Sequence, residues 1–213
     1  MSSKKFTPSI LVWKPKRFFK LIAFIVLIFS IPPFIAIGQE KRDFDITVAG
    51  ISIGEMTATK TVKDDMTFYN VKSQVSFWFF GWVSLDYSMD SEYKGTQLMK
   101  VNGVYNSNRG EFITTIAWQE DHYKVDTRSY KFENTRPVNK PLYHSSAVFF
   151  FEEPFGVYES MADNFGLVSP IQKVRDYYEL DVDGDKNKYY YVNGKLERAI
   201  MYSPIKNYVI KRK

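Results

Sequence analysis

The sequence predicts an all-β protein: an antiparallel meander that forms a curved sheet, half-barrel or barrel, with one short helix and an N-terminal signal helix. The first observation is a period of two from Asp43 onward, where Phe44, Ile46 and Val48 alternate with polar residues, as in a strand with one buried face. The second is the regular spacing of turn signals, which favours a meander. The third is that only the segment 157–165, "VYESMADNF", has the pattern of a helix after the N-terminal region.

Short strands separated by turn residues make up most of the chain after residue 43. Asp183-Gly184 and Asn193-Gly194 are the strongest hairpin signals, because both dipeptides accept the positive φ angles of a type I′ turn. The segment 145–154, "SSAVFFFEEP", fits either a short buried strand or a helical turn. The expected strands are 43–48, 51–62, 66–80, 82–90, 98–108, 110–119, 122–132, 177–182, 188–192, 195–203 and 206–212.

The segment 76–82, "SFWFFGW", concentrates five aromatic side chains in seven positions. Phe77 and Phe79 share a parity with the apolar positions before and after them, so we expect both in the core. The other parity places Trp78, Phe80 and Trp82 together on a face that is otherwise polar. Three interpretations are open for these three residues: a second core layer, the lining of a hydrophobic pocket, or an exposed patch that contacts membrane or a partner.

The first 38 residues have the order of a secretory signal peptide. Six basic and no acidic residues precede an uncharged run from Leu21 to Gly38, and Ala36 and Gly38 occupy the small positions of a cleavage site before Gln39. The alternative is an uncleaved membrane anchor, although Pro32-Pro33 disfavours a regular helix. Under both interpretations residues 39–213 form a single exported β-domain, in the periplasm or cell envelope.

Charge and cysteine content exclude several classes of protein. Removing the six basic N-terminal residues from the total of 29 leaves 23, against 24 acidic residues, so the exported part lacks the basic surface of a nucleic-acid-binding protein. The absence of cysteine excludes disulfides, thiolate metal sites and a cysteine nucleophile. A hydrophobic core must therefore stabilise the domain, and 175 residues suffice for one.

The sequence predicts no catalytic residues, no metal site and no cofactor. His122 and His144 are the only histidines, and neither lies in a motif of a catalytic triad or a zinc site. The acidic segment 181–187, "DVDGDKN", has its glycine at the wrong position for an EF-hand, so a hairpin turn is the better interpretation.

The acidic residues around 152–163 leave one enzymatic alternative open. A carbohydrate-active hydrolase would pair Glu153 with Glu159 or Asp163, since glycosidases use two facing carboxylates. Glu152 and Glu153 are adjacent in an extended segment and so point to opposite faces. Structural ion pairs are the simpler explanation for these carboxylates, with arginines such as Arg128, Arg175 or Arg198 as partners of one that faces inward.

Three phrases of the sequence resemble an uncharacterised family of exported bacterial β-proteins that is common in Bacteroidetes. They are "VAGISIGEMTAT" (48–59), "FFFEEPFGVYES" (149–160) and "DGDKNKYYYVNGKLERAI" (183–200). The family is domain of unknown function 6134, which is distantly similar to domain of unknown function 3108. The resemblance covers nearly the whole exported part, brings no established activity, and implies a curved antiparallel sheet similar to half-barrel carriers of lipid or lipoprotein.

The expected function is that of a non-enzymatic cell-envelope protein. It binds a lipid-like hydrophobic ligand or an envelope protein in its curved sheet, with Trp78, Phe80 and Trp82 as the main apolar contacts. Phe149 and Phe151 are further contacts, and Glu153 orients the polar end of the ligand. The membrane is a partner through the N-terminal segment if that segment is not cleaved. The alternatives are the hydrolase described above and a structural or assembly module.

Overall fold

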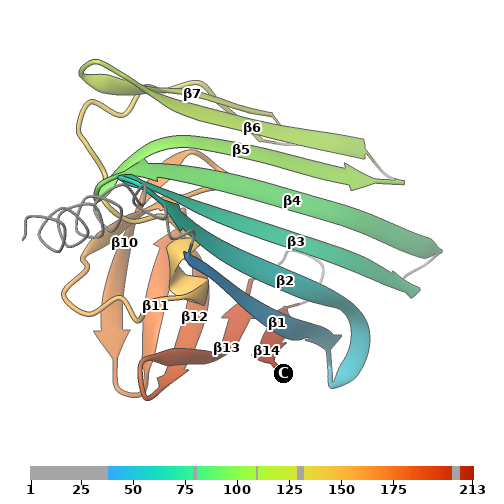
Figure 1. Ribbon diagram of the computed structural model, residues 1–213. Coiled ribbons are helices and arrows are strands. Elements are labelled where there is room, and N and C mark those ends of the chain that lie inside the picture. The colour runs from blue at the N-terminus through green and yellow to red at the C-terminus, as the bar shows by residue number, and fades with distance from the viewer. Residues whose placement is uncertain (1–37, 79–80, 109, 129–131, 203–206) are drawn as a thin grey trace, which may run out of the picture. The chain divides into compact units, whose positions relative to one another are not determined.

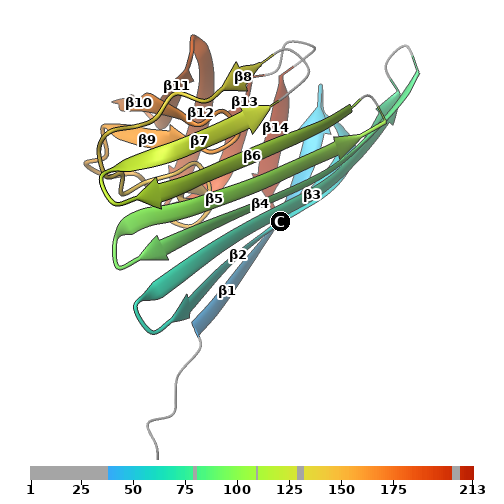
Figure 2. The ribbon, with the colours of Figure 1, turned by 90° about the horizontal axis from the view of Figure 1, so that it is seen from above.

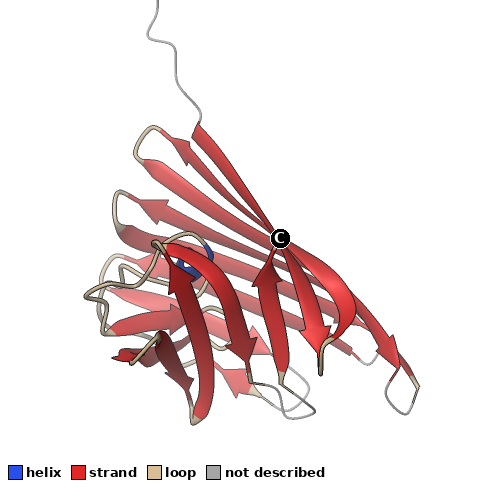
Figure 3. Cartoon of the chain, turned by 90° about the horizontal axis from the view of Figure 1, so that it is seen from below, coloured by secondary structure: helices blue, strands red, loops and turns tan. Residues whose placement is uncertain are grey.

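The computed structural model describes residues 38–213, apart from 79–80, 109, 129–131 and 203–206. Residues Ile37–Lys213 form one compact unit, and nearly all of its regular structure is strand (Figures 1 and 3). Its strands are β1 (Gly38–Val48), β2 (Ile51–Lys63), β3 (Met66–Trp78), β4 (Trp82–Lys94), β5 (Gln97–Ser107), β6 (Gly110–Gln119), β7 (His122–Arg128), β8 (Glu133–Asn134), β9 (Glu159–Ala162), β10 (Leu167–Val174), β11 (Tyr177–Val182), β12 (Asp185–Val192), β13 (Lys195–Met201) and β14 (Tyr208–Arg212).

Among the described residues these fourteen strands form one antiparallel sheet in the order β8-β7-β6-β5-β4-β3-β2-β1-β14-β13-β12-β11-β10-β9. Strands that follow each other in the sequence pair with each other, except β8 and β9, and β14 returns to pair with β1. The sheet is open at β8 and β9, and it curves so that β1–β7 form one broad layer and β9–β14 a second layer folded across it (Figures 1 and 2). The predicted all-β antiparallel meander is confirmed.

The apolar residues whose alternation predicted the strands are the ones whose side chains are buried. Phe44 and Ile46 are buried in β1, and Tyr69, Val71 and Val75 are buried in β3. The two hairpin turns predicted at residues 183–184 and 193–194 are also confirmed, since all four residues have positive φ angles. At Gly54 in β2 a side chain has no room, because an added Cβ would lie 2.1 Å from the carbonyl oxygen of Gln74.

The space between the two layers is filled by the chain itself. A short 3₁₀ helix, η1 (Val148–Phe150), carries buried residues into the interior, where the ring of Phe149 packs against Tyr189 and that of Phe150 against Phe44. Phe151 packs on Tyr69 of β3. Of the two conformations expected for residues 145–154, the helical turn is the observed one.

The helix expected at residues 157–165 is wrong. Residues Glu159–Ala162 form the edge strand β9, which pairs with β10, and Met161 also bridges Ser145. Ser160, Met161 and Ala162 are all buried, so pairing and burial on two faces override the local helical pattern. No helix among the described residues is long and apolar enough to cross a membrane.

The turn after β9 joins the two open edges of the sheet. The side-chain amide of Asn134, in β8, donates hydrogen bonds to the carbonyl oxygens of Phe165 and Gly166 at 3.0 Å. Gly166 has a φ of +61°, and a Cβ there would lie 2.4 Å from a methyl group of Val125. This contact holds the β9–β10 turn against β7 and β8, at the opposite edge of the sheet.

Candidate functional site

Trp78 and Trp82 form an exposed aromatic pair at the end of the β3–β4 hairpin. They lie directly opposite each other in the register of the two strands, and they are 67% and 69% exposed. Both belong to the outer face, because the inner parity of β3 carries Val75 and Phe77. The second-core-layer interpretation is therefore wrong for Trp78 and Trp82, and Phe79 and Phe80 lie outside the described residues.

The remaining predicted contact residues lie elsewhere. Phe149 and Phe151 are buried in the core beside η1, so they pack against protein. Glu153 accepts a hydrogen bond from the hydroxyl of Tyr178 at 3.0 Å and pairs with Lys173 at 3.4 Å. The predicted ligand-binding residues thus lie in three places: the end of the β3–β4 hairpin, the core and the surface of β10–β11. A shared ligand site formed by these residues stays a prediction.

Glu152 and Glu153 have partners on different strands, although residues 151–152 form a turn after η1 and not the extended segment that was expected. Its carboxylate accepts hydrogen bonds from Lys60 at 2.6 Å and from the Tyr69 hydroxyl at 3.1 Å. Partial burial raises the pKa of Glu152, but the hydrogen bond and charge of Lys60 outweigh it and hold the pKa below its usual value. The partners of both glutamates are lysines and tyrosines, and not the arginines that were expected.

The carboxylates of the hydrolase alternative do not share a site. Glu159 pairs with Lys140 at 2.5 Å and Glu153 pairs with Lys173. Asp163 is 2% exposed in the core, where its carboxylate accepts a hydrogen bond from the backbone N–H of Ala147 at 2.9 Å. Burial raises the pKa of Asp163 to about 7. Each carboxylate has its own structural partner, so the geometry gives this alternative no support.

The two histidines and the acidic turn have neighbours that account for their positions in the structure. His122 contacts the neighbouring Asp121 at 2.7 Å, and partial burial lowers the pKa of His144. The segment 181–187 is the turn between β11 and β12, in which Asp181 accepts a hydrogen bond from the backbone N–H of Gly184. The described residues contain no cluster of three or more His, Asp or Glu side chains that could hold a metal ion.

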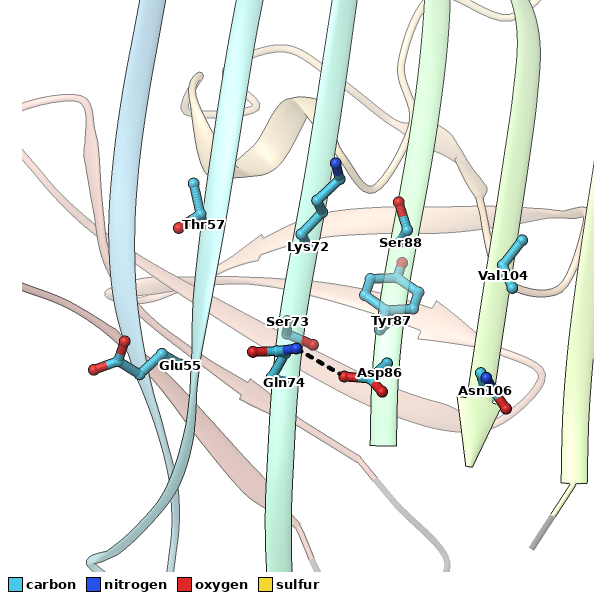
Figure 4. Close-up of a pocket in the computed structure, with 10 residues that line it drawn as sticks. All are labelled: Glu55, Thr57, Lys72, Ser73, Gln74, Asp86, Tyr87, Ser88, Val104 and Asn106. Carbon is cyan, nitrogen blue, oxygen red and sulfur yellow. Dashed lines mark hydrogen bonds between the residues drawn. The ribbon is translucent and has the colours of Figure 1, made fainter. Parts of the chain in front are cut away.

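A polar hollow on the outer face of β2–β5 was missed by sequence reasoning (Figure 4). It has a volume of about 530 Å³ and lies on the same face as the tryptophan pair. Its side chains come from four strands, so it depends on the registers between them, and no local motif marks it. The residues that line it are Glu55, Thr57, Lys72, Ser73, Gln74, Asp86, Tyr87, Ser88, Val104 and Asn106.

Comparison with known proteins supports the fold and names the family. No curated protein matches the chain. The chain is similar in structure to a β-barrel-like protein of domain of unknown function DUF1849 from Brucella abortus, with a TM-score of 0.51 and 10% sequence identity over 84% of this chain and 97% of that one. Residues 44–213 match the family described as domain of unknown function DUF6134. The chain therefore belongs to the DUF6134 family.

Proposed function

We propose that this protein is an exported, non-enzymatic component of the cell envelope that associates with a lipid bilayer through the end of its β3–β4 hairpin. The observation that carries the proposal is the cross-strand pair of Trp78 and Trp82 at that end, with about two-thirds of each side chain exposed. Tryptophan has an apolar ring system and one polar N–H, and it is enriched where membrane meets water. An exposed apolar patch on a soluble domain generally marks a binding surface.

The two ends of the broad layer differ in a way that supports this proposal. An antiparallel meander places the β1–β2 and β3–β4 turns at one end and the β2–β3 and β6–β7 turns at the other (Figure 1). The first end carries Ile51, which is 70% exposed, together with the tryptophan pair. The other end carries the acidic pairs Asp64-Asp65 and Glu120-Asp121. Only the first end is suited to the interfacial region of a bilayer.

The interior gives less support to a ligand enclosed by the sheet. Side chains from residues 149–151, β1, β3 and β12 pack against one another between the layers. The hollow of about 530 Å³ lies on the outer face, not between the layers. An apolar partner that contacts the hairpin end from outside therefore fits the described residues better than a lipid carried inside.

Export is part of the proposal and rests on the N-terminal sequence. Basic residues up to Lys20, the uncharged run from Leu21 to Gly38 and the small residues Ala36 and Gly38 form the order of a signal peptide. Strand β1 begins at Gly38 and pairs there with Val62, at the end of the sheet that carries the acidic turns. The chain thus enters the domain at the end opposite the tryptophan pair.

Vesicle flotation tests the lipid association. The domain 38–213 contains all the strand pairs of the described sheet and its core, so it is the form to assay, with circular dichroism as a check of folding. We expect it to float with vesicles of zwitterionic phospholipid. The double variant Trp78→Ser/Trp82→Ser should bind at least tenfold more weakly, a loss of about 1.4 kcal/mol or more.

The matched control removes two exposed aromatics elsewhere. Phe155 and Tyr158 are 90% and 82% exposed in the segment before β9, so Phe155→Ser/Tyr158→Ser removes comparable apolar surface. Binding of this control should equal that of the wild type. Failure of the wild-type domain to float, or an equal loss in both variants, would overturn the proposal.

A further inference from the structure

The outer-face hollow has a low floor between long polar side chains. Ser88 supplies a small side chain on β4, and Ser73 and Tyr87 belong to the inward parity, so only their backbones face the hollow. Lys72, Gln74 and Asp86 surround this floor on β3 and β4, as Figure 4 shows. A cross-strand hydrogen bond of 3.0 Å from the Gln74 amide to the Asp86 carboxylate fixes two of these groups in place.

Several polar groups around the hollow have no partner within the described part of the chain. The side chains of Lys72, Ser88 and Asn106 make no hydrogen bond or ion pair there. Asn106 lies directly opposite Asp86 in the register of β4 and β5, and Ser88 opposite Val104. Amide, ammonium, hydroxyl and carboxylate groups thus face the same space as available donors and acceptors.

This set of groups fits one ligand chemistry better than the others. The carboxylate of Glu55 is paired with the ammonium group of Lys213 at 2.6 Å, and the charge of Asp86 balances that of Lys72. The hollow therefore has no excess of positive charge that would favour a phosphate or another anion. Val104 is its exposed apolar side chain, so it does not favour a hydrocarbon chain. Sugar hydroxyl groups both donate and accept, and carboxylate and amide side chains can satisfy them in pairs. We propose that the hollow binds a neutral sugar.

The tryptophan pair extends this site along the outer face. Trp78 is four residues from Gln74 on the same face of β3, a distance of about 13 Å at 3.3 Å per residue. The face of an indole ring is electron-rich and attracts the C–H groups of a sugar ring. An oligosaccharide, or the sugar headgroup of a lipid whose bilayer surrounds the tryptophans, would reach both places. Binding of a glycolipid headgroup rests on the lipid association proposed above, whereas binding of a soluble oligosaccharide does not.

Titration of the ¹⁵N-labelled domain 38–213 with maltotriose tests the site in solution. We expect the backbone amides of Lys72, Gln74, Asp86 and Asn106 to shift in a saturable manner. The double variant Asp86→Ala/Asn106→Ala should weaken binding at least tenfold. The matched control is Asn70→Ala/Asp90→Ala, which removes another cross-strand amide–carboxylate pair from the same face of β3 and β4 but outside the hollow. This control should bind like the wild type.

Vesicles that contain digalactosyl diacylglycerol distinguish the two sources of sugar. If the headgroup is the ligand, adding this glycolipid to zwitterionic vesicles should increase flotation at least fivefold, and the Asp86→Ala/Asn106→Ala variant should lose the increase but still bind plain vesicles. If soluble sugar is the ligand, maltotriose binds and the glycolipid has no effect. The proposal would be overturned if maltotriose caused no shifts and the glycolipid did not increase flotation. It would also be overturned if the Asn70→Ala/Asp90→Ala control lost binding as strongly as the Asp86→Ala/Asn106→Ala variant. Failure of the sugar proposal would leave binding to plain vesicles unchanged, so the proposed lipid association is tested independently of it.

Discussion

Asp163 accepts a hydrogen bond at 2.9 Å from the backbone N–H of Ala147, and both residues are 2% exposed. The bond ties the end of β9 to the segment that leads into η1, so the carboxylate lies in the middle of the packed interior. Its second oxygen has no hydrogen-bond partner among the described residues. A buried carboxylate with one partner is costly to ionise, because the charged form loses its hydration.

Asp163 should make the domain less stable at neutral pH than at pH 4. Burial raises its pKa in the folded state from 3.8 to about 7, so the neutral form is favoured in the fold. The contribution of Asp163 to the free energy of unfolding is fully present below about pH 4. It is lost as the pH rises to about 7, where this carboxyl group ionises in the folded state. Asp163→Asn should therefore gain stability relative to wild type between pH 5 and pH 8, by about 3 kcal/mol. Urea unfolding at both pH values measures this difference, and an unchanged difference would contradict the account.

Gly54→Ala should destabilise the β2–β3 pairing strongly. A Cβ at this position would lie 2.1 Å from a backbone oxygen of β3, which can move only if the strands separate. We expect a loss of about 3 kcal/mol in the free energy of unfolding. Gly103→Ala is the control, since its Cβ would meet the flexible end of Met89 at 2.7 Å and should cost clearly less. Urea midpoints that fall equally in the two variants would argue against this packing.

Phe149→Ala should reveal the contribution of η1 to the core. Phe149 is fully buried, and its ring contacts Tyr189 with centroids 5.2 Å apart. Truncating such a ring costs about 3–5 kcal/mol. Phe155→Ala, at a position that is 90% exposed, should change stability by no more than about 0.5 kcal/mol. A mild effect of Phe149→Ala in thermal or urea unfolding would mean that the interior is not packed as described.

The exported protein should begin at Gln39. Cleavage after Gly38 follows from the small residues Ala36 and Gly38 behind an uncharged run. The intact mass of the protein recovered from an envelope fraction measures this directly. A mass that includes residues 1–38 would instead favour the uncleaved membrane anchor.

The sequence predicts the strands better than it predicts the contacts between distant segments. The inward residues of β3 and β4 could be predicted because alternation follows directly from burial of one face. The hydrogen bond from Arg42 to the carbonyl oxygen of Phe150 joins residues 108 positions apart, and the Lys60–Glu152 pair joins residues 92 apart. No local pattern specifies such contacts.

The site illustrates the same limit. The aromatic parity of Trp78 and Trp82 was visible in the sequence, but whether that face was buried depended on how the sheet curves. The polar hollow requires the registers of β2, β3, β4 and β5 together. Its residues look like an ordinary solvent-facing strand pattern when each strand is considered alone.

The most direct test of lipid association is the fluorescence of the tryptophan pair itself. Trp118 is the other tryptophan of the domain 38–213, so the Trp118→Phe variant leaves only Trp78 and Trp82 as reporters. On addition of zwitterionic vesicles we expect their emission to shift to shorter wavelength, and lipids brominated on the acyl chains should quench it. Unchanged emission with vesicles in excess, and no quenching, would contradict the proposal that this hairpin end enters the bilayer interface.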